Sequence, residues 1–106
     1  MRLDAETLEV DRTFDAIYSN KVLMHLTREA CRRSLARQAE LLEPGGIAMH
    51  AVWLGDKPDE EHGGVRFVYY TLESFSALLP AALHVVDHEV YTEMEEGDSL
   101  LVVLER

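Results

Sequence analysis

Residues 14–26 read FDAIYSNKVLMHL and contain a short apolar strand signal followed by a polar break. Residues 14–19 show little polar alternation, which is typical of a strand covered on both faces of a parallel sheet. The tripeptide Ser19-Asn20-Lys21 interrupts the apolar pattern, which then resumes in a loop that contains His25. The segment therefore predicts a buried strand whose carboxyl end turns polar.

An amphipathic helix is predicted directly after this segment, over residues 28–42. Thr27 is a good N-cap, and apolar side chains recur after it at helical spacing. Pro44-Gly45-Gly46 ends the helix, because proline cannot continue a helix and glycine accepts a positive φ. The buried face of this helix comprises Cys31, Leu35, Ala39 and Leu42, with Gln38 as its one polar member.

The rest of the chain predicts a further helix and three more strands. Residues 47–54 are almost wholly apolar, which predicts a central strand covered on both faces. Thr71 caps a short helix that ends near Pro80, and residues 84–94 and 99–105 predict an antiparallel hairpin. The order strand, helix, strand, helix, strand, strand predicts an α/β fold in which only the final strand is antiparallel.

Length, charge and cysteine content indicate a small, soluble, cytoplasmic protein. The 106 residues suffice for one domain. A formal charge of −10 disfavours a nucleic-acid partner, because phosphate backbones are repelled. No run approaches the roughly 20 apolar residues of a membrane span, so no membrane partner is expected. The single Cys31 excludes an internal disulfide and fits a reducing compartment.

The histidines and the cysteine have structural explanations from the residues alone. His25 is expected to bond to backbone in its loop, and His50 to be a satisfied residue of the core. His84 and His88 share a strand face without a third ligand, so no metal site is expected. Cys31 is expected to act as a small apolar residue on the helix face.

The motifs and their order resemble the C-terminal half of a class I S-adenosylmethionine-dependent methyltransferase domain. FDAIYSN is similar to the FD-x-V-x-S fourth strand of that family, and VLMHL to the loop after it. LLEPGG is similar to the L-x-PGG turn before the fifth strand, and YTLESFSALL to the helix before the last two strands. DAETL, at residues 4–8, is similar to the DA-x-x-L that follows the third strand. The resemblance implies an α/β fold with a partial Rossmann-like sheet, strand order 4-5-7-6, last strand antiparallel, and two main helices.

On this resemblance, residues 1–106 form a single truncated methyltransferase-like domain. The family's glycine-rich loop is absent from the printed sequence, as are its first three strands. We therefore expect one wall of a cofactor crevice, at the switch point beyond the carboxyl ends of the strands. The expected segments are a post-strand-3 loop at 1–13, a strand–helix–strand unit at 14–54, a charged loop at 55–70, and a helix with a C-terminal hairpin at 71–106.

The resemblance also implies a site for S-adenosylmethionine. Its cofactor-binding residues would be Asp4 and Ala5 at the adenine, and Ser19, Asn20 and Lys21 at the methionine end. The path to the methyl acceptor would be lined by Val22, Leu23 and His25. No residue is given a catalytic role, because methyl transfer needs positioning of the reactants rather than a nucleophile.

Two functions follow, and both are kept open. The first is the C-terminal half of a methyltransferase that acts on a small molecule and is not active alone. The second is a non-catalytic half-fold that serves as a dimerisation or protein-interaction module. Strand 14–19 would have an unpaired edge, which predicts a homodimer through that strand or a partner chain that supplies the missing half. An unrelated α/β domain that reuses these turns is a third reading.

Overall fold

The computed structural model describes residues 14–106, so the predicted site residues Asp4 and Ala5 lie outside the described part. No helix in residues 14–106 has the length and the apolar run that a membrane crossing requires. The elements run in the order β1 (Phe14–Asn20), the 3-10 helix η1 (Leu23–His25), α1 (Arg28–Leu41), β2 (Leu42–Trp53), β3 (Glu60–His62), β4 (Val65–Phe67), α2 (Leu72–Ser76), β5 (His84–Tyr91) and β6 (Ser99–Glu105).

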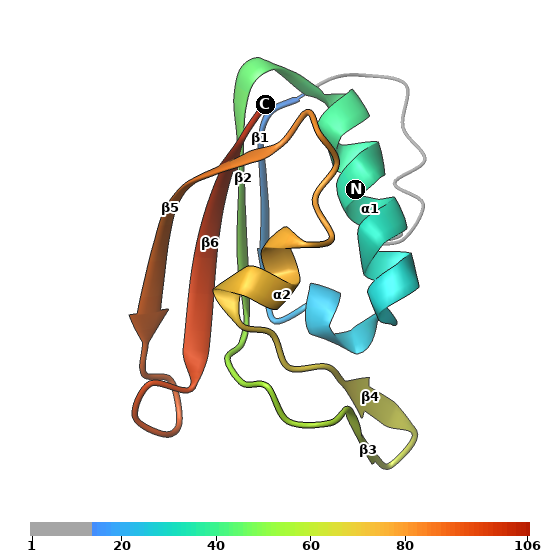
Figure 1. The fold of residues 1–106 in the computed structure, drawn as a ribbon, viewed down its shortest axis with the longest axis vertical. Helices are drawn as coiled ribbons and strands as arrows, with labels where there is room; N and C mark the ends of the chain where they lie inside the picture. Colours follow the sequence, from blue (N-terminus) through green and yellow to red (C-terminus); the bar gives the residue numbers. More distant parts are fainter. Residues whose placement is uncertain (1–13) are drawn as a thin grey trace.

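A mixed sheet of four strands in the order β1-β2-β6-β5 forms the centre of the molecule (Figure 1). β1 and β2 are parallel, and β6 is antiparallel to both β2 and β5. This is the predicted order, 4-5-7-6, with the last strand antiparallel. The fold class expected from the sequence is therefore confirmed.

Both helices pack on one face of this sheet. Thr27 caps α1 as predicted, because its side chain accepts a hydrogen bond from the Ala30 N–H (3.1 Å). Thr71 and Ser74 form a capping box at the start of α2. The shared core contains, from α1, Cys31, Leu35 and Ala39; from α2 and its flanks, Tyr70, Phe75, Leu78 and Leu83; and from the sheet, Ala48, Val52, Leu100, Val102 and Leu104.

The opposite face of the sheet carries no described helix. Tyr18 on β1 has 66% of its surface exposed, and Met49 and Leu101 on the neighbouring strands are only half-buried. These side chains, with Asn20 and Glu89, line a shallow hollow that crosses all four strands. The sheet therefore buries one face well and leaves the other open within residues 14–106.

The prediction that residues 14–19 are covered on both faces is wrong for the described molecule. β1 is an edge strand with β2 as its single described neighbour, and all seven of its residues are exposed or half-buried. The apolar composition of a strand reports its tendency to be buried, but not the presence of the element that buries it.

The second strand also begins earlier than predicted. β2 starts at Leu42 rather than at 47, because Leu42 pairs with Phe14. Residues 43–46 then bulge before the regular register resumes, and Gly45 adopts a φ of 81° within this bulge. Proline and glycine end α1 as expected, but the chain turns directly into a strand.

The segment expected as a charged loop, 55–70, contains a small hairpin, β3–β4. It lies beside η1 (Figure 1), and the Val68 N–H donates to the Met24 carbonyl at 2.9 Å. Gly63 and Gly64 form its tight turn with φ values of 59° and 84°. The hairpin thus fastens the loop after β1 to the loop after β2.

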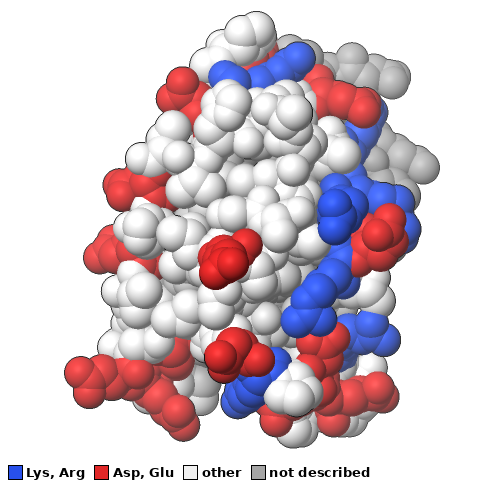
Figure 2. Space-filling model, viewed as in Figure 1, with Lys and Arg blue, Asp and Glu red and all other residues white. Residues whose placement is uncertain are grey.

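Charged side chains are unevenly distributed over the surface. Figure 2 shows acidic side chains along the β5 side and at the β5–β6 turn, while the arginines of α1 gather on the other side. The exposed acids on the β5 side are Asp87, Glu89, Glu93, Glu95 and Glu96.

Candidate functional site

The carboxyl ends of β1 and β2 lie side by side and define the candidate site. Ser19 pairs with His50 and Asn20 with Ala51 in the parallel register. The Lys21 N–H extends this ladder by donating to the Ala51 carbonyl at 2.8 Å. The polar tripeptide therefore lies where two parallel strands end, at one edge of the sheet.

Ser19 begins a line of buried polar contacts that passes into α1. Its Oγ lies 2.5 Å from His50 Nδ1, and His50 Nε2 lies 2.6 Å from Gln38 Oε1. The Gln38 amide nitrogen in turn donates to Ser34 Oγ at 3.2 Å. His50, Gln38 and Ser34 are each at least 98% buried. Gln38, the one polar residue on the predicted apolar face of the helix, thus has its partners in the core.

The donor and acceptor roles along this line of hydrogen bonds follow from the chemistry of Gln38 and His50. An amide oxygen only accepts, so His50 Nε2 carries the hydrogen that Gln38 Oε1 receives. Burial lowers the pKa of His50 to about 4, so the ring is neutral near pH 7. Nδ1 of the neutral ring is therefore an acceptor, and the Ser19 hydroxyl donates to it. The prediction that His50 is a satisfied core residue is confirmed.

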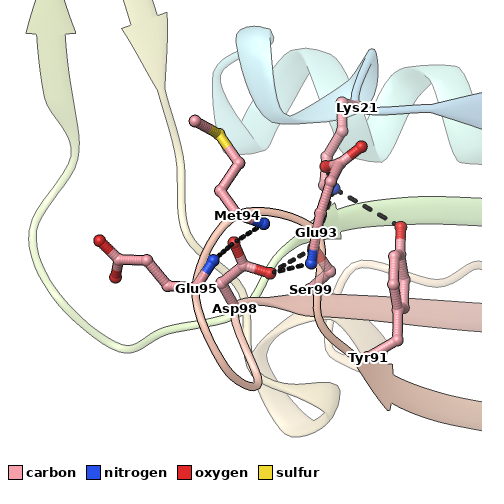
Figure 3. Close-up of polar contacts among 7 residues, drawn as sticks. All are labelled: Lys21, Tyr91, Glu93, Met94, Glu95, Asp98 and Ser99. Carbon is pink, nitrogen blue, oxygen red and sulfur yellow. Dashed lines mark hydrogen bonds and ion pairs between the residues drawn. The ribbon is translucent and has the colours of Figure 1, made fainter.

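Lys21 has a strained backbone and a side chain that crosses toward β6 (Figure 3). Its φ is 56°, a left-handed conformation that residues other than glycine adopt infrequently. The ammonium forms an ion pair with Glu93, donates to Ser99 Oγ at 3.0 Å, and lies 3.8 Å from the centre of the Trp53 ring. Lys21 thus joins the end of β1 to the β5–β6 hairpin.

The turn that presents Glu93 is organised around the Asp98 carboxylate. Although desolvation raises the pKa of Asp98, backbone N–H groups of Glu95, Glu93 and Met94 outweigh that effect and hold it well below its usual range. The same carboxylate accepts from Ser99 Oγ at 2.9 Å (Figure 3). A fixed turn therefore supports the residue that binds Lys21.

An open hollow of about 420 Å³ lies beyond the carboxyl end of β2. Its apolar wall includes Trp53 and Tyr69, and the Lys57 ammonium lies 4.2 Å from the centre of the Tyr69 ring. The β5–β6 turn forms its other wall. Two aromatic rings at the end of a strand thus border the hollow.

His25 follows the prediction that it bonds to backbone. Its Nδ1 donates to the Arg66 carbonyl at 2.9 Å, and its ring meets Phe67 edge-on with centres 5.2 Å apart. Val22 is 40% exposed, whereas Leu23 is 2% exposed and packs in the core. Of the three residues predicted to line the acceptor path, Val22 and His25 are accessible from outside. Cys31 is fully buried on the helix face, as expected.

Comparison with solved structures identifies the fold. The chain superimposes on 1,6-didemethyltoxoflavin-N1-methyltransferase of Burkholderia thailandensis, solved with 1,6-didemethyltoxoflavin and S-adenosylhomocysteine, with a TM-score of 0.80 and 25% identity. It also matches the N-methyltransferase NodS of Bradyrhizobium japonicum, solved with S-adenosylhomocysteine, with a TM-score of 0.67 and 20% identity. The chain has part of the class I S-adenosylmethionine-dependent methyltransferase fold. The resemblance drawn from the sequence is thereby confirmed.

This methyltransferase-like chain spans about half the length of these proteins. Each of the first two matches aligns with 96% of this chain. The aligned part is 48% of the Burkholderia enzyme and 50% of NodS. An S-adenosylmethionine-dependent methyltransferase of Clostridium acetobutylicum is covered over 63% of its length, with a TM-score of 0.77 and 10% identity. No family model and no curated protein matches the sequence.

The methyltransferase-like sheet places three of the five residues predicted to bind the cofactor, Ser19, Asn20 and Lys21, at the end of β1. The Ser19 side chain meets His50 on the helix-covered face, whereas Asn20 borders the hollow on the open face. The sheet also brings in residues that the sequence did not assign to the site. Glu93 and Ser99 reach Lys21 from more than 70 residues away, and no local motif marks them. Gln38 did carry a signal, because it is polar at a helical position where its neighbours are apolar. Among residues 14–106, no group of three or more His, Cys, Asp or Glu side chains gathers in a way that would hold a metal ion.

Proposed function

We propose that residues 14–26 form one wall of an S-adenosylmethionine crevice in a methyltransferase that acts on a small molecule. The observation that carries this proposal is the position of Ser19 and Asn20. They end β1 beside β2, in a sheet that matches methyltransferases solved with the demethylated cofactor. Open α/β sheets bind ligands beyond the carboxyl ends of their strands.

The chemistry of these residues fits the methionine end of the cofactor. That end carries an ammonium, a carboxylate and a sulfonium, and the Ser19 and Asn20 side chains provide oxygen acceptors for the ammonium. Lys21 would repel a cationic ligand, but its ammonium is paired with the Glu93 carboxylate, which offsets its charge. We therefore assign Lys21 a supporting role, in which it fixes the end of β1. The bound cofactor would supply the electrophilic methyl group.

The acceptor is proposed to be a small molecule that reaches the crevice past Val22 and His25. Both are accessible at the surface, and the formal charge of −10 disfavours a nucleic-acid substrate. The opposite wall, with a glycine-rich loop, is not among these 106 residues. We propose that another segment or chain provides it, so that the 106 residues alone bind cofactor but do not transfer methyl groups.

Calorimetric titration with S-adenosylhomocysteine tests the cofactor wall. Binding in the micromolar range is expected, and Asn20→Ala should weaken it about tenfold, since it removes a hydrogen bond to a charged group. Asn20 is exposed at the end of β1, so this change should leave the fold intact. Ser76→Ala on α2 is the matched control and should bind as the unaltered chain does. No binding at millimolar ligand would reject a cofactor site on these residues.

We propose as a second function that the chain is an interaction module. The specific observation is the β1 edge, which has no described neighbour on one side and borders an open sheet face. Unpaired strand edges pair with other chains. A homodimer through β1, or a partner chain that completes the sheet, would pair the hydrogen-bonding groups of this edge. The oligomeric state distinguishes these outcomes from a monomer.

A further inference from the structure

The Ser19 hydroxyl donates its hydrogen to His50, whereas the hydroxyl of an exposed strand serine can turn toward any partner. Its Oγ is 2.5 Å from His50 Nδ1, and the contacts beyond His50 are each buried from solvent. Water does not compete for these groups, so the hydrogen-bond direction set at Gln38 extends to Ser19. The Ser19 oxygen is half-buried, and because donation uses only its hydrogen, both of its lone pairs are left to accept hydrogen bonds.

The serine–histidine contact resembles a nucleophile and its base, but the third group argues against that chemistry. Gln38 is neutral and cannot stabilise the imidazolium that forms when a histidine removes a hydroxyl proton. The proton of Ser19 therefore stays on Ser19. What the arrangement provides is orientation of the hydroxyl, not its ionisation.

We propose that the Gln38–His50 pair makes Ser19 a one-way acceptor, so that the crevice takes a ligand group with a hydrogen on nitrogen or oxygen, such as an ammonium. A group that offers only lone pairs there, such as a carboxylate, meets another lone pair and is rejected. This inference rests on the proposed function and names the polarity of the ligand group that contacts Ser19. Ser19 is the binding residue, and His50 and Gln38 are positioning residues that act through it.

Nitrogen NMR of the ¹⁵N-labelled chain tests the direction without any ligand. Long-range proton–nitrogen correlation at pH 7 should show His50 with its hydrogen on Nε2 and an accepting Nδ1. The His50 signals are assigned by their loss in His50→Gln. Gln38→Leu removes the acceptor at Nε2 and should change the tautomer balance, with spectral dispersion confirming that the variant is folded. A hydrogen on Nδ1 in the unaltered chain would overturn the proposal, because Ser19 would then accept from His50 and donate outward.

Titration with S-adenosylhomocysteine tests the consequence for binding. Ser19→Ala should weaken binding about tenfold or more, whereas Ser19→Thr, which keeps a hydroxyl, should stay within about threefold. Gln38→Leu should weaken binding although Ser19 is present, and its effect should not add to that of Ser19→Ala, because the two act as one unit. Ser76→Ala is the control.

The two ways of failing are distinct. If the unaltered chain does not bind S-adenosylhomocysteine at millimolar concentration, the proposed function is rejected, and the ligand role of Ser19 with it. If the chain binds and Ser19→Ala binds equally well, the cofactor wall stands and only the one-way acceptor is overturned.

Discussion

At the scale of single residues, His50 connects the core to the candidate site. It is 1% exposed and bonded at both ring nitrogens, and burial lowers its pKa to about 4. In the unfolded chain a histidine titrates near 6.5. Between these values the unfolded state binds more protons than the folded state, so the free energy of unfolding should rise with pH.

We expect His50 to make the chain less stable at pH 4 than at pH 7 by about 3 kcal/mol, on top of contributions from other groups. Urea unfolding from pH 4 to pH 7 measures this. His50→Gln should flatten the dependence, because glutamine does not titrate. His88→Gln changes an exposed histidine of β5 and should keep the steep dependence. Equal slopes for His50→Gln and the unaltered chain would contradict the assignment.

At the scale of elements, the bulge of β2 joins α1 to the sheet. Residues 43–46 fall between two registers of the β1–β2 pair, and the backbone comes close to itself at Gly46. A Cβ at Gly46 would lie 2.8 Å from the Glu43 carbonyl oxygen and 3.3 Å from that of Asp15. Both are backbone atoms, so neither can rotate away.

Gly46→Ala should therefore destabilise the chain by about 1–3 kcal/mol, as overpacking does. Gly55→Ala is the matched control, because its Cβ would meet Tyr69 Cβ at 3.4 Å, an ordinary contact. That variant should be neutral or slightly more stable, since alanine restricts the unfolded chain. Thermal unfolding of the two variants side by side provides the measurement, and similar losses in both would argue against a close approach at Gly46.

The elements differ in how well the sequence predicts them, and the reason is the range of the interactions. α1 is predicted to within a residue because Thr27 and the Pro44-Gly45-Gly46 turn act locally. The early start of β2 depends on pairing with Phe14, and the β3–β4 hairpin depends on contacts with η1. The sequence of each segment alone therefore does not predict these two features.

In the candidate site too, locally determined features are predicted from the sequence and long-range contacts are not. The polar end of β1 is visible in the sequence as Ser19-Asn20-Lys21. The partners of these residues are not, because the sheet register places His50 beside Ser19 across 31 positions, and Lys21 reaches Ser99 across 78. Long-range register follows from the assembled sheet rather than from either strand.

At the scale of the whole molecule, β1 and β5 are the edge strands of the sheet that residues 14–106 form, and the predicted pairing is through β1. The Lys21 N–H points to β2, and successive N–H groups of a strand alternate in direction, so the N–H of Tyr18 points away from β2. Proline at position 18 would block that edge without breaking the β1–β2 ladder.

We expect the chain to sediment as a dimer at micromolar concentration, and Tyr18→Pro to weaken the association at least about tenfold by removing an edge donor. Tyr18→Thr also removes the exposed ring but keeps the N–H, so it separates the edge from the open face and should stay within a few-fold of the unaltered chain. Sedimentation velocity across a concentration series measures both. A monomer at every concentration, or equal effects of proline and threonine, would reject pairing through β1.

The arginines of α1 affect how the association of two copies through β1 would depend on salt concentration. α1 carries four arginines against two glutamates and lies on the β1 side of the sheet (Figure 1). A two-fold pairing of β1 edges would bring two positively charged helices toward each other, in a protein whose formal charge of −10 already repels a second copy. Ions screen such repulsion over about 8 Å at physiological ionic strength. Added salt should therefore tighten this association, whereas an assembly that joins the α1 side of one copy to the acidic β5 side of the next would come apart.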